Sequence, residues 1–85
     1  LEQVAAGAAR FSGQIHLYPG DITDQSGMVK TVAAIEQDLG PINLAVLNAG
    51  TYLPDTVENF TADQLKAQFN INVYGTAHCL EPVLN

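Results

Sequence analysis

The chain has 85 residues, of which 47% are hydrophobic and 14% charged, and its net charge is −6. This length suits one small domain. Nine acidic residues stand against three scattered bases, Arg10, Lys30 and Lys66, so we expect no basic face for nucleic acid or anionic lipid.

Targeting and redox signals are also missing from the sequence. The longest apolar runs are far shorter than a membrane-crossing helix requires, and the first residues lack the layout of a signal peptide. Cys79 is the only cysteine, which excludes an internal disulfide or a multi-cysteine metal site. We therefore expect a cytoplasmic protein that holds no metal and binds neither nucleic acid nor membranes.

The chain begins with a predicted helix and a predicted strand. Apolar residues recur at helical spacing over residues 1–11, and Gly13 is a suitable stop. The following stretch "QIHLYPGD", residues 14–21, alternates its apolar side chains and is therefore predicted to be a short strand. Pro19 and Gly20 mark its end.

A second helix is predicted over residues 24–40. Thr23 or Asp24 can cap its start, Gly40 suits the position after its end, and Pro41 prevents its continuation. Its apolar stripe consists of Met28, Val32, Ile35 and Leu39.

A second strand and a third helix complete the pattern. Residues 42–48, "INLAVLN", are almost continuously apolar, which is typical of a strand buried on both faces of a parallel sheet. After a loop containing Pro54, Thr61 and Gln64 form a Thr-x-x-Gln capping box, so a helix is predicted to begin near Ala62. Its middle carries poor helix formers, namely Asn70, Asn72 and Gly75.

The order helix, strand, helix, strand, helix predicts an α/β fold with a parallel sheet of two strands. Ligands of open parallel sheets bind beyond the carboxyl ends of the strands. Asp21 follows the first predicted strand, and Asn48, Ala49 and Gly50 follow the second. Small residues there allow a ligand to approach the backbone, and Asn48 adds an amide that both donates and accepts. The alternative is a plain tight turn, in which Asn and Gly are favoured for their tolerance of positive φ.

Three stretches together resemble the middle of the short-chain dehydrogenase/reductase family. They are "GDITD" at 20–24, "LAVLNAG" at 44–50 and "NINVYGT" at 70–76, and the resemblance covers essentially the whole chain. It implies a doubly wound Rossmann fold, of which residues 1–85 form the central part of a single NAD(P)-binding domain. It also implies hydride transfer between NAD or NADP and an alcohol or ketone substrate.

The resemblance implies a role for each matching residue. Asp21 would accept from the adenine amino group, and Ile22 would pack against that ring or donate to it from its backbone. Asn48, Ala49 and Gly50 would border the cofactor ribose. Asn72 matches the asparagine of the catalytic tetrad, which helps to hold a water connected to the catalytic lysine. The alternatives are that Asp21 only starts a turn or caps a helix, and that Asn72 is an exposed helical residue without a role.

Several family features are absent. Leu47 stands where the family usually has a second Asn, and the glycine-rich turn, the catalytic Ser and the Tyr-x-x-x-Lys motif are missing, since no tyrosine here has a Lys four residues on. We therefore expect an internal segment of a reductase of roughly 200 to 250 residues, inactive alone. The helix containing Asn72 would form a homodimer or homotetramer.

Two other functions remain open. One is epimerisation or dehydration of a nucleotide sugar, and the other is a non-catalytic nucleotide-binding or regulatory module. His78 and Cys79 are residue types found in metal and nucleophile sites, but neighbours on a helix point about 100° apart and do not easily share a ligand.

Overall fold

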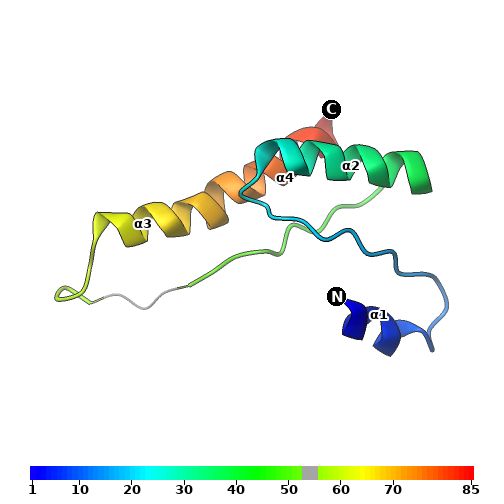
Figure 1. Cartoon of the computed structure of the whole chain (residues 1–85), viewed down its shortest axis with the longest axis horizontal. Coiled ribbons are helices and arrows are strands. Elements are labelled where there is room, and N and C mark those ends of the chain that lie inside the picture. Colours follow the sequence, from blue (N-terminus) through cyan, green and yellow to red (C-terminus); the bar gives the residue numbers. More distant parts are fainter. Residues whose placement is uncertain (53–55) are drawn as a thin grey trace.

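The computed structural model describes residues 1–52 and 56–85, and the loop expected at Pro54 lies outside them. Its helices are α1 (Glu2–Ala8), α2 (Gln25–Leu39), α3 (Ala62–Phe69), the π-helix η1 (Asn70–Gly75) and α4 (Thr76–Leu84). Figure 1 shows that α3, η1 and α4 form one continuous helix, called the long helix below, with α2 beside α4, while α1 lies apart. The three predicted helical regions are thus confirmed.

Local capping explains where two of these helices begin and end. Asp24, rather than Thr23, caps α2, because its Oδ1 accepts from the Gly27 N–H at 3.1 Å. Gly40 after the end of α2 has a φ of 96°, a value that favours glycine. At the start of α3, Thr61 Oγ1 accepts from the Gln64 N–H at 3.1 Å, as the capping box predicts.

The poor helix formers of the long helix lie in its π-helical segment, η1. Asn70, Asn72 and Gly75 all belong to this segment, in which backbone hydrogen bonds join residues i and i+5 instead of i and i+4. Thr76 donates its hydroxyl to the Asn72 carbonyl at 3.0 Å, which supports the backbone at this irregular turn. Such π-helical turns are often found at functional sites.

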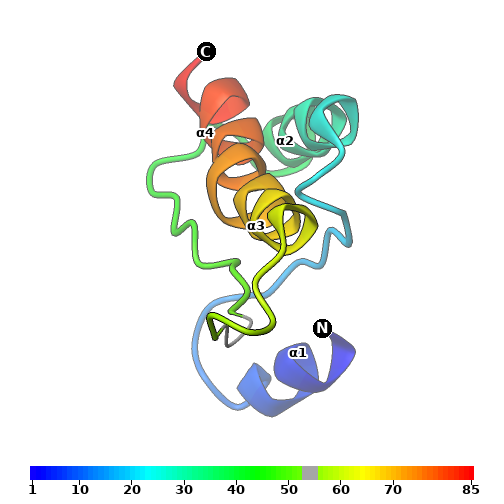
Figure 2. The same cartoon turned by 90° about the vertical axis from the view of Figure 1, so that its left-hand side faces the viewer.

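The predicted parallel sheet is wrong for this structure. No strand occurs in residues 1–52 and 56–85, and residues 14–20 and 41–50 are extended chain without a partner. Figure 2 shows that these two segments pass on opposite sides of the long helix. A strand needs hydrogen bonds from a neighbouring strand. The two predicted strands would be the third and fourth of a Rossmann sheet, and in that strand order two other strands lie between them. The apolar pattern therefore predicted two strands that the described residues do not form.

The core of this structure is small. In the described part of the chain, Met28 and Val32 on α2 are the only buried apolar side chains. Leu44 and Val46 are 83% and 79% exposed. The radius of gyration is 16.0 Å, whereas a compact domain of this length has about 12 Å. Among the helices described, none is both long and apolar enough to cross a membrane.

Candidate functional site

The side chain of Asn72 connects the long helix to the loop after residue 47. Its Oδ1 accepts from the Thr51 N–H at 2.8 Å, and its Nδ2 donates to the Thr51 carbonyl at 2.8 Å. A side-chain amide thus pairs with both backbone groups of one residue, as a neighbouring peptide would. A Cβ on Gly50 would lie 3.3 Å from Asn72 Oδ1, so glycine gives this amide its room.

The turn at Asp21 is organised by its own carboxylate. Asp21 Oδ1 accepts from the Thr23 hydroxyl at 2.7 Å and from the Thr23 N–H at 2.9 Å, while the Asp21 carbonyl accepts from the Asp24 N–H at 3.0 Å. The hydroxyl bond first, and then the backbone bond, lower the pKa of Asp21. The carboxylate is therefore ionised at neutral pH, and its Oδ2 has no hydrogen-bond partner among the described residues.

Ile22 joins this turn to the same long helix by two contacts. A Cβ on Gly75 would lie 2.7 Å from Ile22 Cδ1 and 2.8 Å from its Cγ1, so the buried Gly75 admits the isoleucine side chain. The Ile22 carbonyl lies 2.8 Å from His78 Nδ1 and accepts a hydrogen bond from it. The Ile22 N–H has no partner within the part of the chain that the structure describes.

The long helix therefore contacts both segments that the sequence singled out. Asn72, Gly75 and His78 follow one another at intervals of three residues across η1 and α4. The first holds the loop that contains Asn48, Ala49 and Gly50, and the other two hold the turn of Asp21 and Ile22. Asn48 and Ala49 are themselves exposed, and no described residue hydrogen-bonds the Asn48 side chain.

The importance of His78 was missed from the sequence, where it was considered only as a metal ligand or nucleophile. A polar residue one turn after Gly75 is a weak signal, since many helices carry one, and its partner lies 56 residues away. Burial raises the pKa of the Cys79 thiol, which disfavours the reactive thiolate form. Across residues 1–52 and 56–85 there is no cluster of three His, Cys, Asp or Glu side chains suited to a metal ion.

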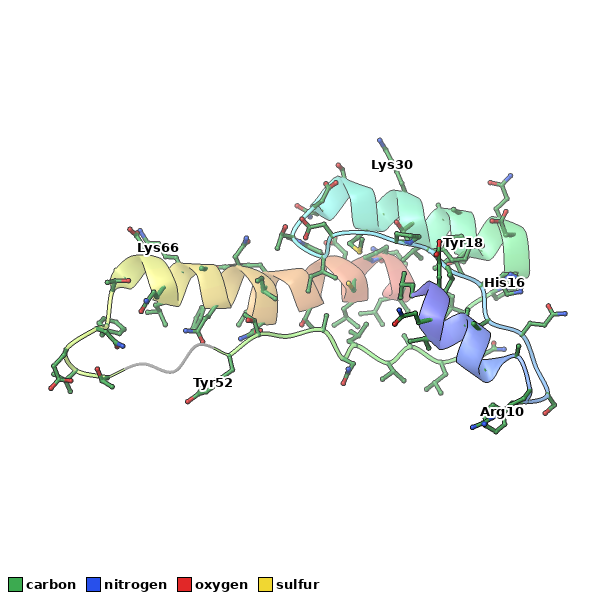
Figure 3. All side chains as sticks on the ribbon, turned by 60° about the horizontal axis from the view of Figure 1, so that its bottom comes forward. Arg10, His16, Tyr18, Lys30, Tyr52 and Lys66 are labelled. Carbon is green, nitrogen blue, oxygen red and sulfur yellow. The ribbon has the colours of Figure 1, made fainter. Side chains whose placement is uncertain are left out.

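Tyr18 and Tyr52 lie in surroundings that do not suit an acid–base catalyst. Tyr18 donates its hydroxyl to Asp38 Oδ2 at 2.8 Å, and this bond is the main cause that raises the pKa of Tyr18. Tyr52 is 79% exposed, and Figure 3 shows it projecting away from the helices. Figure 3 also shows Arg10, Lys30 and Lys66 well apart from one another.

Comparison with known proteins finds a family and several relatives. The family model described as short chain dehydrogenase matches residues 1–85. An uncharacterized oxidoreductase of Bacillus subtilis, YusZ, is 34% identical over 99% of this chain and 29% of its own length. The acetoacetyl-CoA reductase of Shinella zoogloeoides is 35% identical over 81% of this chain and 29% of its own length. The gluconate 5-dehydrogenase of Gluconobacter oxydans is 38% identical over 62% of this chain and 21% of its own length.

The chain thus spans less than a third of the length of these relatives. The names of the second and third relatives describe different substrates. The region matched by the family model includes the turn of Asp21, the loop of Asn48 to Gly50, and Asn72.

Proposed function

The chain belongs to the short-chain dehydrogenase family, and from this membership we propose that its 85 residues are part of a longer NAD(P)-dependent oxidoreductase. Oxidoreductases of this family use NAD or NADP. The complete protein would transfer a hydride between the nicotinamide and the carbon of an alcohol or ketone. The observation that carries this proposal is the pair of hydrogen bonds by which Asn72 attaches the Asn-Ala-Gly loop to the π-helical turn.

The turn of Asp21 and Ile22 suits the adenine end of a dinucleotide. Asp21 is ionised and keeps Oδ2 for an amino group, because an ionised carboxylate only accepts hydrogen bonds. The neighbouring Ile22 N–H supplies a donor for a ring nitrogen. An acceptor and a donor on adjacent residues complement the amino group and ring nitrogen of adenine.

The loop and Asn72 suit the reacting end. Asn48, Ala49 and Gly50 leave the backbone accessible to a ribose. Asn72 still has one N–H and one lone pair after pairing with Thr51, which is enough to hold a water. These residues would bind the cofactor and order the proton path, and the bound nicotinamide would supply or accept the hydride. With no Tyr-x-x-x-Lys here, residues outside this chain must protonate the carbonyl oxygen.

The direct test is hydride transfer by the complete protein. NADH and NADPH are each offered with a panel of ketones and aldehydes, including 3-oxoacyl thioesters and oxidised sugar acids, while absorbance follows cofactor oxidation. We expect oxidation that requires both protein and carbonyl compound, with deuterium from labelled cofactor appearing on the product carbon. Cofactor binding without oxidation of any substrate would favour the non-catalytic module, and absence of both would reject the proposal.

Asn72→Ala tests the role of this residue in the same assay. Without the amide, the loop and the water lose their hydrogen bonds to residue 72. We therefore expect kcat to fall about 100-fold, which is at the lower end of the effects of general acid–base catalysis. The affinity for the cofactor should change much less. Asn72→Asp separates the two bonds, since it keeps an acceptor for the Thr51 N–H and replaces the donor to the Thr51 carbonyl with a charged carboxylate oxygen. Unchanged turnover in Asn72→Ala would remove Asn72 from the mechanism.

A further inference from the structure

We propose that His78 is a positioning residue for the adenine end of the site, holding the turn of Asp21 and Ile22 in the orientation that receives the base. This proposal rests on the proposed function, because it presumes that the turn binds an adenine nucleotide. His78 was assigned no role by the sequence pattern, and it touches neither the predicted catalytic asparagine nor the Asn-Ala-Gly loop.

The hydrogen bond itself determines the tautomer of the ring. His78 Nδ1 lies 2.8 Å from the Ile22 carbonyl, in a partly buried contact. A carbonyl only accepts, so the proton is on Nδ1. Nε2 of a neutral ring is then an acceptor, and the bond between α4 and the turn depends on the δ position alone.

The rigid peptide plane between Ile22 and Thr23 transmits this bond to the Asp21 carboxylate. Its carbonyl is held by His78, and its N–H donates to Asp21 Oδ1 at 2.9 Å. Because a peptide unit is planar, the plane cannot rotate without breaking both bonds. Because the direction of the Ile22 carbonyl is fixed, the side of the turn on which Asp21 Oδ2 can accept a hydrogen bond from a ligand is fixed as well.

Gly75 supplies the second point of attachment. Its missing Cβ gives room for the Ile22 side chain, while His78, one turn later, binds the carbonyl of the same residue. A residue held by both its side chain and its backbone has little freedom to swing, so removing His78 should loosen the turn without removing its packing.

The experiment measures two half-ligands on the complete protein by calorimetry. The probes are 5′-AMP, which carries the adenine, and nicotinamide mononucleotide, which does not. We expect His78→Leu to raise the Kd of 5′-AMP about five- to tenfold, the effect of one lost hydrogen bond, and to leave the Kd of nicotinamide mononucleotide within twofold.

Two amide variants separate positioning from helix stability. Asn places an N–H where His78 has Nδ1, whereas Gln places it one bond further away. We expect His78→Asn to bind 5′-AMP within about twofold of wild type and His78→Gln to resemble His78→Leu. Helix propensity favours Gln over Asn, so a purely structural role would give the opposite order.

Each outcome decides between the proposals. If the wild-type protein binds neither 5′-AMP nor the dinucleotide, both the proposed function and this inference fail. If it binds 5′-AMP and His78→Leu binds equally well, the inference alone is overturned. Parallel losses of both half-ligands together with a lower Tm, in the order that helix propensity predicts, would also overturn it.

Discussion

At the scale of single residues, Asp21 starts a turn, which is one of the alternatives that the sequence presented, and its contact with adenine stays a prediction. In this turn Oδ1 of Asp21 accepts both bonds from Thr23, which lower the pKa of its carboxyl group and leave the second oxygen available. The helix cap is a different residue, Asp24. The pattern "GDITD" could predict that one acid would cap and another would turn, but not which, since that depends on backbone angles that Thr23 and Asp24 adopt together.

Thr23→Val tests what lowers the pKa of Asp21. The variant removes the hydroxyl, which is the largest cause, and keeps the backbone N–H, so we expect the pKa to rise toward its ordinary value. A lowered pKa stabilises the fold above the ordinary pKa, and this contribution disappears as pH falls through the lowered value. In Thr23→Val this contribution to stability is therefore smaller, and the acid limb of nucleotide binding begins at higher pH.

Carbon NMR of the Asp21 carboxyl during a pH titration measures this shift directly. Thr23→Ser keeps the hydroxyl and is the matched control, for which we expect the wild-type titration. The same Asp21 pKa in the Val and Ser variants would show that the hydroxyl bond has no such effect.

At the scale of elements, helix ends were predictable because caps and stops are local. Thr61, Asp24 and Gly40 act as the sequence indicated. The π-helical turn was visible only as poor helix formers in a helix interior, and its contacts are with two segments distant in sequence, which no local pattern reveals. The strands failed as a prediction for the same reason: alternation and apolarity predict extended chain, whereas a strand also needs a neighbour.

Gly75→Ala tests the close packing between the π-helical turn and Ile22. The new methyl group would lie 2.7 Å from Ile22 Cδ1, so the isoleucine must move and the turn of Asp21 with it. We expect destabilisation of about 1–3 kcal/mol, as for other overpacked sites, and weaker binding of 5′-AMP, both measured on the complete protein.

Gly7→Ala is the control for this substitution, since Gly7 also lies in a helix but has no atom near its Cβ position. We expect it to leave both stability and 5′-AMP binding unchanged or to stabilise slightly. Equal behaviour of the two variants would contradict the packing contact at Gly75.

At the scale of the whole molecule, the 85 residues bury little apolar surface. The two buried apolar side chains among residues 1–52 and 56–85, together with the extended shape, cannot offset the conformational entropy lost on folding. We therefore expect the isolated 85-residue polypeptide at low concentration to lose helical circular dichroism gradually on heating. A single sharp calorimetric transition of about 60 kcal/mol, the value for a cooperative domain of this length, would contradict this.

The central claim is that one helix places two loops that together hold a dinucleotide, and a crystal structure of the complete protein with NAD or NADP tests it most directly. The account predicts the adenine amino group within hydrogen-bond distance of the Asp21 carboxylate, the ribose against Asn48 to Gly50, and His78 still bonded to the Ile22 carbonyl. A cofactor bound away from both loops, or an adenine that contacts neither Asp21 nor Ile22, would contradict it.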